Sequence, residues 1–124
     1  MILLDTNILI EILKGNQETI DKVQGFTGML AISAITVMEL YYGALNKSEL
    51  NKLEKFVSMF SIIQLNENIS TQATKLVKTY AKSHNLDIQD SLIASSALVN
   101  NCKLFTYNLK GFKYQKSRTY IKEN

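Results

Sequence analysis

Short apolar segments alternate with longer amphipathic segments along the whole chain, and this alternation limits the fold more than any other feature. The opening segment, residues 1–4, is continuously apolar, which is typical of a strand buried on both faces. We expect strands at residues 1–4, 29–32, 61–65, 103–107 and 120–121, and helices at 8–13, 18–26, 36–45, 48–60, 69–80 and 88–100. Because parallel strands need crossover connections, the pattern predicts an α/β fold with three layers (α/β/α) around a central parallel sheet of four to five strands.

The composition is that of one globular domain spanning residues 1–124. Proline is absent, which argues against a turn-rich β-sandwich and against a Pro-rich linker. The single cysteine, Cys102, excludes an internal disulfide and fits a reducing cytoplasm. The longest apolar run is far shorter than the roughly 20 residues that cross a bilayer. We therefore expect a cytoplasmic protein that does not enter the membrane.

Two acidic residues follow apolar segments, at positions where a surface acid is not expected. Asp5 ends the first apolar segment, where it could also be the N-cap of the next helix. Glu39 completes the pattern Thr36-Val37-Met38-Glu39 of a capping box, in which the glutamate bonds back to the start of the helix. For both acids, a capping role and a chemical role stay open.

A third acid, Asp90, is harder to explain as a helix cap. Ile93, Ala94 and Ala97 lie one and two turns beyond it on the same side, so its side chain is expected to turn towards the core. A half-buried charge normally needs a partner. Favourable interaction with the helix dipole is an adequate explanation for Asp87 but a poorer one for Asp90.

The three acids are expected to converge, because helices that follow parallel strands all begin at the same edge of the sheet. Carboxylates that converge raise each other's pKa unless a cation lies between them. A set of oxygen ligands without His or Cys favours Mg²⁺ or Mn²⁺ over zinc. The chemistry that follows is attack of a metal-activated water on a phosphodiester.

Positive charge is concentrated at the end of the chain. Residues 103–124 contain six basic residues and one acid, whereas residues 1–102 contain eight basic and ten acidic residues. Aromatic residues stand among these basic residues at Tyr107, Phe112, Tyr114 and Tyr120. Such a segment attracts phosphate groups, although a solvated surface with core tyrosines explains the same pattern.

Four segments together resemble the PIN-domain nucleases, and especially the VapC-type toxins of bacterial toxin–antitoxin pairs. They are residues 3–10 (LLDTNILI), 32–44 (ISAITVMELYYGA), 90–97 (DSLIASSA) and 106–112 (TYNLKGF). The segments occur in the order of the family, and the length of the chain matches that of a whole toxin. The resemblance implies a PIN-like fold and a Mg²⁺-dependent endoribonuclease that acts on RNA, forms a homodimer and is neutralised by a cognate antitoxin.

The resemblance also implies roles for individual residues. Asp5, Glu39 and Asp90 take the catalytic and metal-binding positions of the family. Polar neighbours that would line the site are Thr6, Asn7, Thr106 and Asn108. The fourth segment of the family often carries another acid where this chain has Gly111, so the number of metal ions stays open. Asp87 either supplies the missing charge or only caps the helix, and the cap is slightly favoured.

Two other functions stay open at this point. Gly111 is compatible with a PIN-like module that binds RNA or a protein partner without cutting. A phosphohydrolase with Asp5 as its nucleophile ranks last, because such enzymes commonly carry a second aspartate two residues later, where this chain has Asn7.

Overall fold

The computed structural model describes residues 1–108 and 119–121. Five strands form one sheet in the order β3-β2-β1-β4-β5, and every neighbouring pair is parallel. The predicted parallel sheet is therefore confirmed, with strand ends that differ by one or two residues from those expected. The strands are β1 (Ile2–Leu4), β2 (Leu30–Ser33), β3 (Ser61–Ile63), β4 (Lys103–Thr106) and β5 (Thr119–Ile121).

The chain reverses its direction of travel across the sheet at β1. It runs outward from β1 through β2 to β3, and it then returns to the other side of β1 to form β4 and β5. Leu4 is the register partner of Phe105, so β1 and β4 end side by side. The backbone N–H of Asp5 continues this pairing by donating to the carbonyl of Phe105 at 3.0 Å. Such a switch point in strand order is where parallel sheets place ligands.

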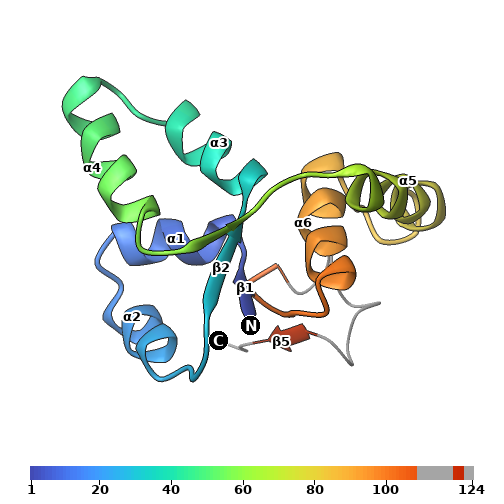
Figure 1. The fold of residues 1–124 in the computed structure, drawn as a ribbon, viewed down its shortest axis with the longest axis horizontal. Coiled ribbons are helices and arrows are strands. Elements are labelled where there is room, and N and C mark those ends of the chain that lie inside the picture. The colour runs from blue at the N-terminus through green and yellow to red at the C-terminus, as the bar shows by residue number, and fades with distance from the viewer. Residues whose placement is uncertain (109–118, 122–124) are drawn as a thin grey trace.

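Helices cover both faces of the sheet (Figure 1). Neighbouring strand residues alternate between the faces, as Leu3 and Leu4 show: Leu3 packs in one core and Leu4 in the other. The core with Leu3 includes α5 and α6, and the core with Leu4 includes α1, α2, α3 and α4. The helices are α1 (Thr6–Leu13), α2 (Gln17–Gln24), α3 (Ala34–Tyr42), α4 (Lys47–Val57), α5 (Glu67–Tyr80) and α6 (Ile88–Val99). The predicted three-layer α/β/α arrangement is confirmed.

Helix α4 begins at Lys47, one residue before the predicted start at Ser48. Asn46 is the N-cap, because its Oδ1 accepts a hydrogen bond from the backbone N–H of Glu49 at 2.9 Å. Ser48 lies inside the first turn. Both residues are good caps, and only the direction of the incoming chain decides between them. No helix in the described ranges is both long and apolar enough to cross a membrane.

Candidate active site

Three acids predicted from the sequence line one cavity at the carboxyl edge of the sheet. Asp5 follows β1, Glu39 lies on α3 and Asp90 lies in the first turn of α6. The cavity has a volume of about 220 Å³. Its lining consists of Asp5, Thr6, Asn7, Ile10, Glu39, Gln89, Asp90 and Ile93. The topology therefore brings together acids that are up to 85 positions apart in the sequence.

Asp5 is both a helix cap and a buried acid in the cavity. Its side chain is only 4% exposed, and its Oδ1 accepts from the backbone N–H of Thr6 at 2.8 Å, as the capping interpretation predicts. Its other oxygen, Oδ2, accepts from the Thr106 hydroxyl at 2.6 Å and from the Asn7 amide at 3.2 Å. The Thr106 hydroxyl itself accepts from the backbone N–H of Asn108, so its own proton is directed at Asp5. Asp5 is thus held rigidly in one orientation.

Glu39 is not part of a capping box, so that interpretation is wrong. Helix α3 begins at Ala34, and its N-cap is Ser33, whose hydroxyl accepts from the backbone N–H of Ile35 at 3.2 Å. Glu39 therefore lies in the second turn, too far along the helix to bond back to its start. Its carboxylate instead accepts a hydrogen bond from the Thr6 hydroxyl at 2.8 Å.

Thr36 takes part in the same contact, a role that the sequence did not suggest. Its hydroxyl is buried and lies 2.9 Å from the hydroxyl of Thr6. Because Thr6 has a single hydroxyl proton, which it gives to Glu39, Thr36 must be the donor in this pair. The sequence spacing could have indicated this role, because Thr36 lies three residues before Glu39 and so faces the same side of the helix.

Asp90 and Asp87 have different roles in the structure. Asp87 is exposed and is the N-cap of α6, since its Oδ1 accepts from the backbone N–H of Asp90 at 2.7 Å. The capping interpretation of Asp87 is therefore confirmed, and Asp87 does not line the cavity. Asp90 is half-buried, and its Oδ2 accepts from the Asn108 amide at 3.2 Å.

Two carboxylates in the cavity, those of Asp5 and Asp90, have raised pKa values. Burial raises the pKa of Asp5 above its usual 3.8; hydrogen bonds from Thr106 and Thr6 lower it, and the charges of Glu39 and Asp87 raise it further. Burial, followed by the charges of Asp87, Asp5 and Glu39, raises the pKa of Asp90 to about 7. Without a cation, two or more of these groups are therefore costly to ionise together.

The donor set of the cavity fits a hard divalent cation. Its acidic side chains present oxygen only, and no His or Cys lines it. Among the described residues, no group of three acidic, His or Cys side chains is arranged so that all three could hold a metal ion together. Mg²⁺ commonly binds through one or two carboxylates and keeps several waters, so a complete cage is not required.

All four polar neighbours predicted from the sequence are at this edge of the sheet. Thr6 contacts Glu39, Asn7 and Thr106 contact Asp5, and Asn108 contacts Asp90. The sequence did not suggest Gln89, which also lines the cavity. The prediction about Gly111, and the basic residues beyond Lys103, lie outside the described residues.

Comparison with known proteins agrees with this fold. The sequence profile of the PIN domain matches residues 2–115. Ribonuclease VapC1 of Methanocaldococcus jannaschii is 31% identical over 113 residues, which cover 90% of this chain and 79% of that protein. Ribonuclease VapC19 of Mycobacterium tuberculosis is 31% identical over 116 residues, covering 90% of this chain and 92% of the relative.

Solved structures extend the similarity to nearly the whole fold. VapBC-1 from nontypeable Haemophilus influenzae has a chain that superposes with a TM-score of 0.82 at 27% identity, covering 99% of this chain and 98% of that one. A toxin-antitoxin complex from Klebsiella pneumoniae gives a TM-score of 0.79 at 29% identity, with 90% of each chain covered. On the fold, the sequence profile and these relatives, the chain belongs to the PIN domain family.

Proposed function

We propose that this protein is a metal-dependent endoribonuclease and the toxin of a toxin–antitoxin pair. The observation that carries the proposal is the cavity in which Asp5, Glu39 and Asp90 meet at the switch point of a parallel sheet. Relatives named ribonucleases, and similar chains solved in toxin–antitoxin complexes, support the substrate class and the biological role.

The residues of the chain position the carboxylates for this chemistry. Thr106 and Asn7 fix the Asp5 carboxylate, Thr6 fixes Glu39, and Asn108 contacts Asp90. These neutral donors orient the acids without cancelling their negative charge, so the cavity keeps its attraction for a cation. Mg²⁺ or Mn²⁺, held by Asp5, Glu39 and Asp90 either directly or through bound water, would polarise the scissile phosphate and activate the attacking water.

Asp87 has a smaller part in this proposal. Its carboxylate is used as a helix cap, yet its charge is among the causes that raise the pKa of Asp5 and of Asp90. We propose that Asp87 strengthens cation binding through this charge and not as a ligand in the cavity.

The proposal extends to partners and place of action. We propose that a cognate antitoxin covers the acidic cavity, that the toxin forms a homodimer, and that both act in the cytoplasm. Chains of similar fold are solved as VapBC complexes, one of them from Rickettsia felis bound to a promoter DNA fragment, which supports the antitoxin as a partner.

Metal dependence is tested by incubating the purified protein with total RNA in Mg²⁺, in Mn²⁺ and in EDTA. We expect discrete cleavage products with either metal, at least about 100-fold less cleavage in EDTA, and recovery when Mg²⁺ is added in excess. Cleavage that continues unchanged in EDTA would contradict the proposal. Binding of RNA without cleavage under any of these conditions would instead support the non-cutting module.

A further inference from the structure

A second cavity adjoins the acidic one along α1. Its volume is about 410 Å³, and it shares two lining residues, Asn7 and Ile10, with the acidic cavity. Its other lining residues are Glu11, Lys14, Asn16, Glu18 and Tyr107. The acidic cavity is smaller than a typical small-molecule pocket, whereas the second cavity has a volume in the range of such pockets.

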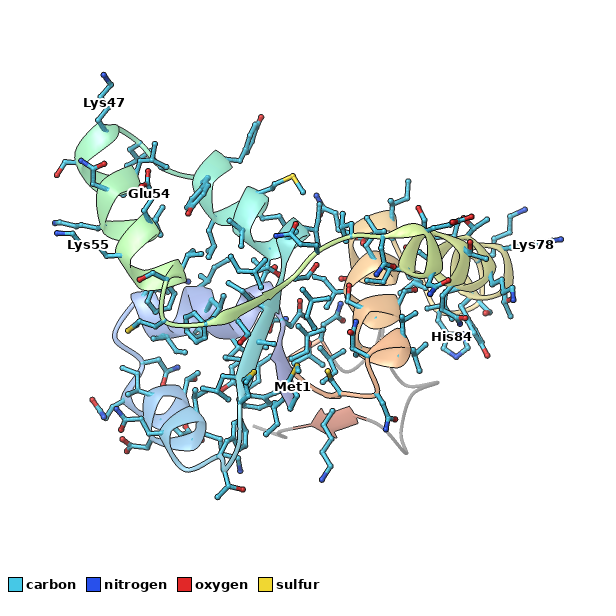
Figure 2. The ribbon with its side chains drawn as sticks, viewed as in Figure 1. Met1, Lys47, Glu54, Lys55, Lys78 and His84 are labelled. Carbon is cyan, nitrogen blue, oxygen red and sulfur yellow. The ribbon has the colours of Figure 1, made fainter. Side chains whose placement is uncertain are left out.

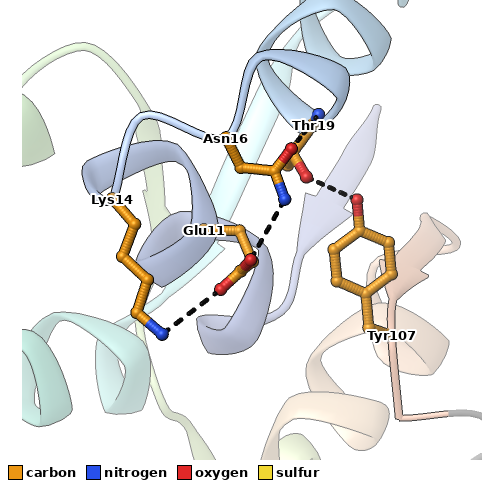
Figure 3. A network of polar contacts seen from close by, with 5 residues as sticks. All are labelled: Glu11, Lys14, Asn16, Thr19 and Tyr107. Carbon is orange, nitrogen blue, oxygen red and sulfur yellow. Dashed lines mark hydrogen bonds and ion pairs between the residues drawn. The ribbon is translucent and has the colours of Figure 1, made fainter.

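One wall of the second cavity presents a carboxylate and an ammonium group side by side (Figure 3). The Oε1 of Glu11 accepts from the Asn16 amide at 3.1 Å, and its Oε2 lies 3.5 Å from the Nζ of Lys14. The side chain of Glu11 is 30% exposed, and that of Lys14 is 69% exposed. An exposed ion pair of this kind is weak, so Lys14 can turn to a phosphate while Asn16 keeps Glu11 in place.

The opposite wall is Tyr107, and it is fixed at both ends. Its hydroxyl lies 2.6 Å from the hydroxyl of the fully buried Thr19 (Figure 3). Its backbone N–H donates to Oδ1 of Asn7 at 3.2 Å. The other end of the Asn7 side chain donates to Asp5. The side-chain amide of Asn7 therefore connects Tyr107 to Asp5 in the acidic cavity.

These walls match the chemistry of a nucleotide. A nucleobase offers N–H donors to a fixed carboxylate and a flat face to an aromatic ring, and its backbone offers phosphate oxygens to an ammonium group. Only an unpaired base exposes its Watson–Crick edge. The ligand chemistry is therefore that of a single-stranded nucleic acid, and the proposed ribonuclease function makes it RNA.

We propose that the second cavity binds the nucleotide next to the scissile phosphate of a single-stranded RNA, with Glu11 selecting the base and Lys14 binding a phosphate. This inference rests on the proposed ribonuclease function for the position of the scissile phosphate. It assigns to α1 a role in choosing the cleavage site.

The test compares Glu11→Gln with the matched control Glu54→Gln on a pool of random single-stranded RNA. Glu54 is an exposed residue of α4 that lines neither cavity (Figure 2). Sequencing the cleaved ends gives the base preference at each position beside the cut. We expect Glu11→Gln to lower the preference at one flanking position by about 10-fold, because glutamine replaces one acceptor oxygen by a donor. Glu54→Gln should keep the wild-type preference.

A binding experiment in EDTA tests the cavity without cleavage. We expect Lys14→Gln to weaken binding of a labelled single-stranded RNA about 3- to 10-fold. The slope of log affinity against log salt concentration should fall by the amount expected for about one lost phosphate contact. Lys47→Gln on α4 is the matched control and should bind as the wild type does. Thermal unfolding of every variant detects any loss of folding.

The outcomes separate the two proposals. If the wild type shows no metal-dependent cleavage but Lys14→Gln weakens RNA binding, the proposed function fails and the nucleotide cavity stands. If the wild type cleaves while Glu11→Gln keeps its base preference and Lys14→Gln its affinity, the nucleotide cavity is wrong and the ribonuclease stands.

Discussion

Replacing Asp5 by asparagine is expected to lower metal-dependent RNA cleavage by at least about 1,000-fold while leaving the protein folded. Asp5 is the most buried of the three acids in the cavity, and Thr106, Asn7 and the backbone of Thr6 fix its orientation. Removing its charge removes a cation ligand and leaves the remaining groups in place. Effects of this size are typical when one member of a catalytic set is lost.

The fold should tolerate this substitution because asparagine can make the same local contacts. Asparagine caps helices about as well as aspartate, so the bond from the Thr6 backbone to the side chain can persist. The Thr106 hydroxyl can donate to an amide oxygen or accept from an amide N–H. Since burial and the neighbouring carboxylates raise the pKa of Asp5, a neutral side chain should be at least as stable in the metal-free protein.

The measurement is the initial rate of RNA cleavage in Mg²⁺, with circular dichroism and thermal unfolding as the test of folding. Asp21→Asn is the matched control, because Asp21 is an exposed acid of α2 that lines neither cavity. Its rate should equal that of the wild type. Cleavage by Asp5→Asn at the wild-type rate would remove Asp5 from the mechanism.

The raised pKa of Asp90 leads to a second prediction, which concerns how the stability of the metal-free protein depends on pH. Its pKa is about 7 in the folded protein and near 3.8 in the unfolded chain. Between these values the folded protein holds a proton that the unfolded chain releases, so folding stability falls as the pH rises through this range. The contribution of Asp90 is fully present below about pH 4 and is lost above about pH 7.

Only part of the pKa shift is expected to appear as stability, because Asp90 is half-buried and solvent screens its interactions. We expect the free energy of unfolding in EDTA to fall by about 1–2 kcal/mol more in the wild type than in Asp90→Asn between pH 4.5 and pH 7.5. Asparagine keeps an oxygen that can accept from Asn108 and removes the titration. The same variant should lose RNA cleavage, because it lacks a cation ligand.

Urea unfolding at several pH values in EDTA measures the difference, and excess Mg²⁺ should cancel it near pH 7.5 by binding the ionised form. Asp21→Asn should keep the wild-type pH profile. A wild type whose stability has the same pH profile as Asp90→Asn would show that Asp90 titrates normally and does not lie among repelling charges.

The sheet and its layers could be predicted because buried strands carry apolar residues on both faces. Leu3 and Leu4 pack on opposite sides of β1, and Leu104 and Phe105 do the same on β4. Such continuous apolar runs can be recognised in the sequence without knowledge of the tertiary structure. Parallel pairing then follows from the helices between them.

The first residues of α3 and α4 could not be predicted from the local sequence, because two residues that can act as N-caps lie within a few positions of each helix start. Ser33 caps α3 where β2 ends, which leaves Thr36 free to contact Thr6. Asn46 takes the corresponding place before α4. The choice depends on where the preceding segment leaves the fold, which no local pattern records.

The candidate site was predictable as far as strand order determines it. Asp5, Glu39 and Asp90 meet because their elements end or begin at one edge of the sheet. The partner of Glu39 is different: Thr6 lies 33 residues away, and only the packing of α1 against α3 brings the two together. Tyr107 and Asn7, 100 residues apart, meet in the second cavity because α1 packs against β4.

The central claim is that carboxylates from separate parts of the chain together bind a functional divalent cation. It is tested most directly by calorimetric titration of Mn²⁺ into the metal-free wild type and into Asp5→Asn, with Asp21→Asn as control. We predict saturable binding to the wild type and to the control, and loss of that binding in Asp5→Asn. Equal binding by Asp5→Asn and the wild type, or no binding by the wild type, would contradict the claim.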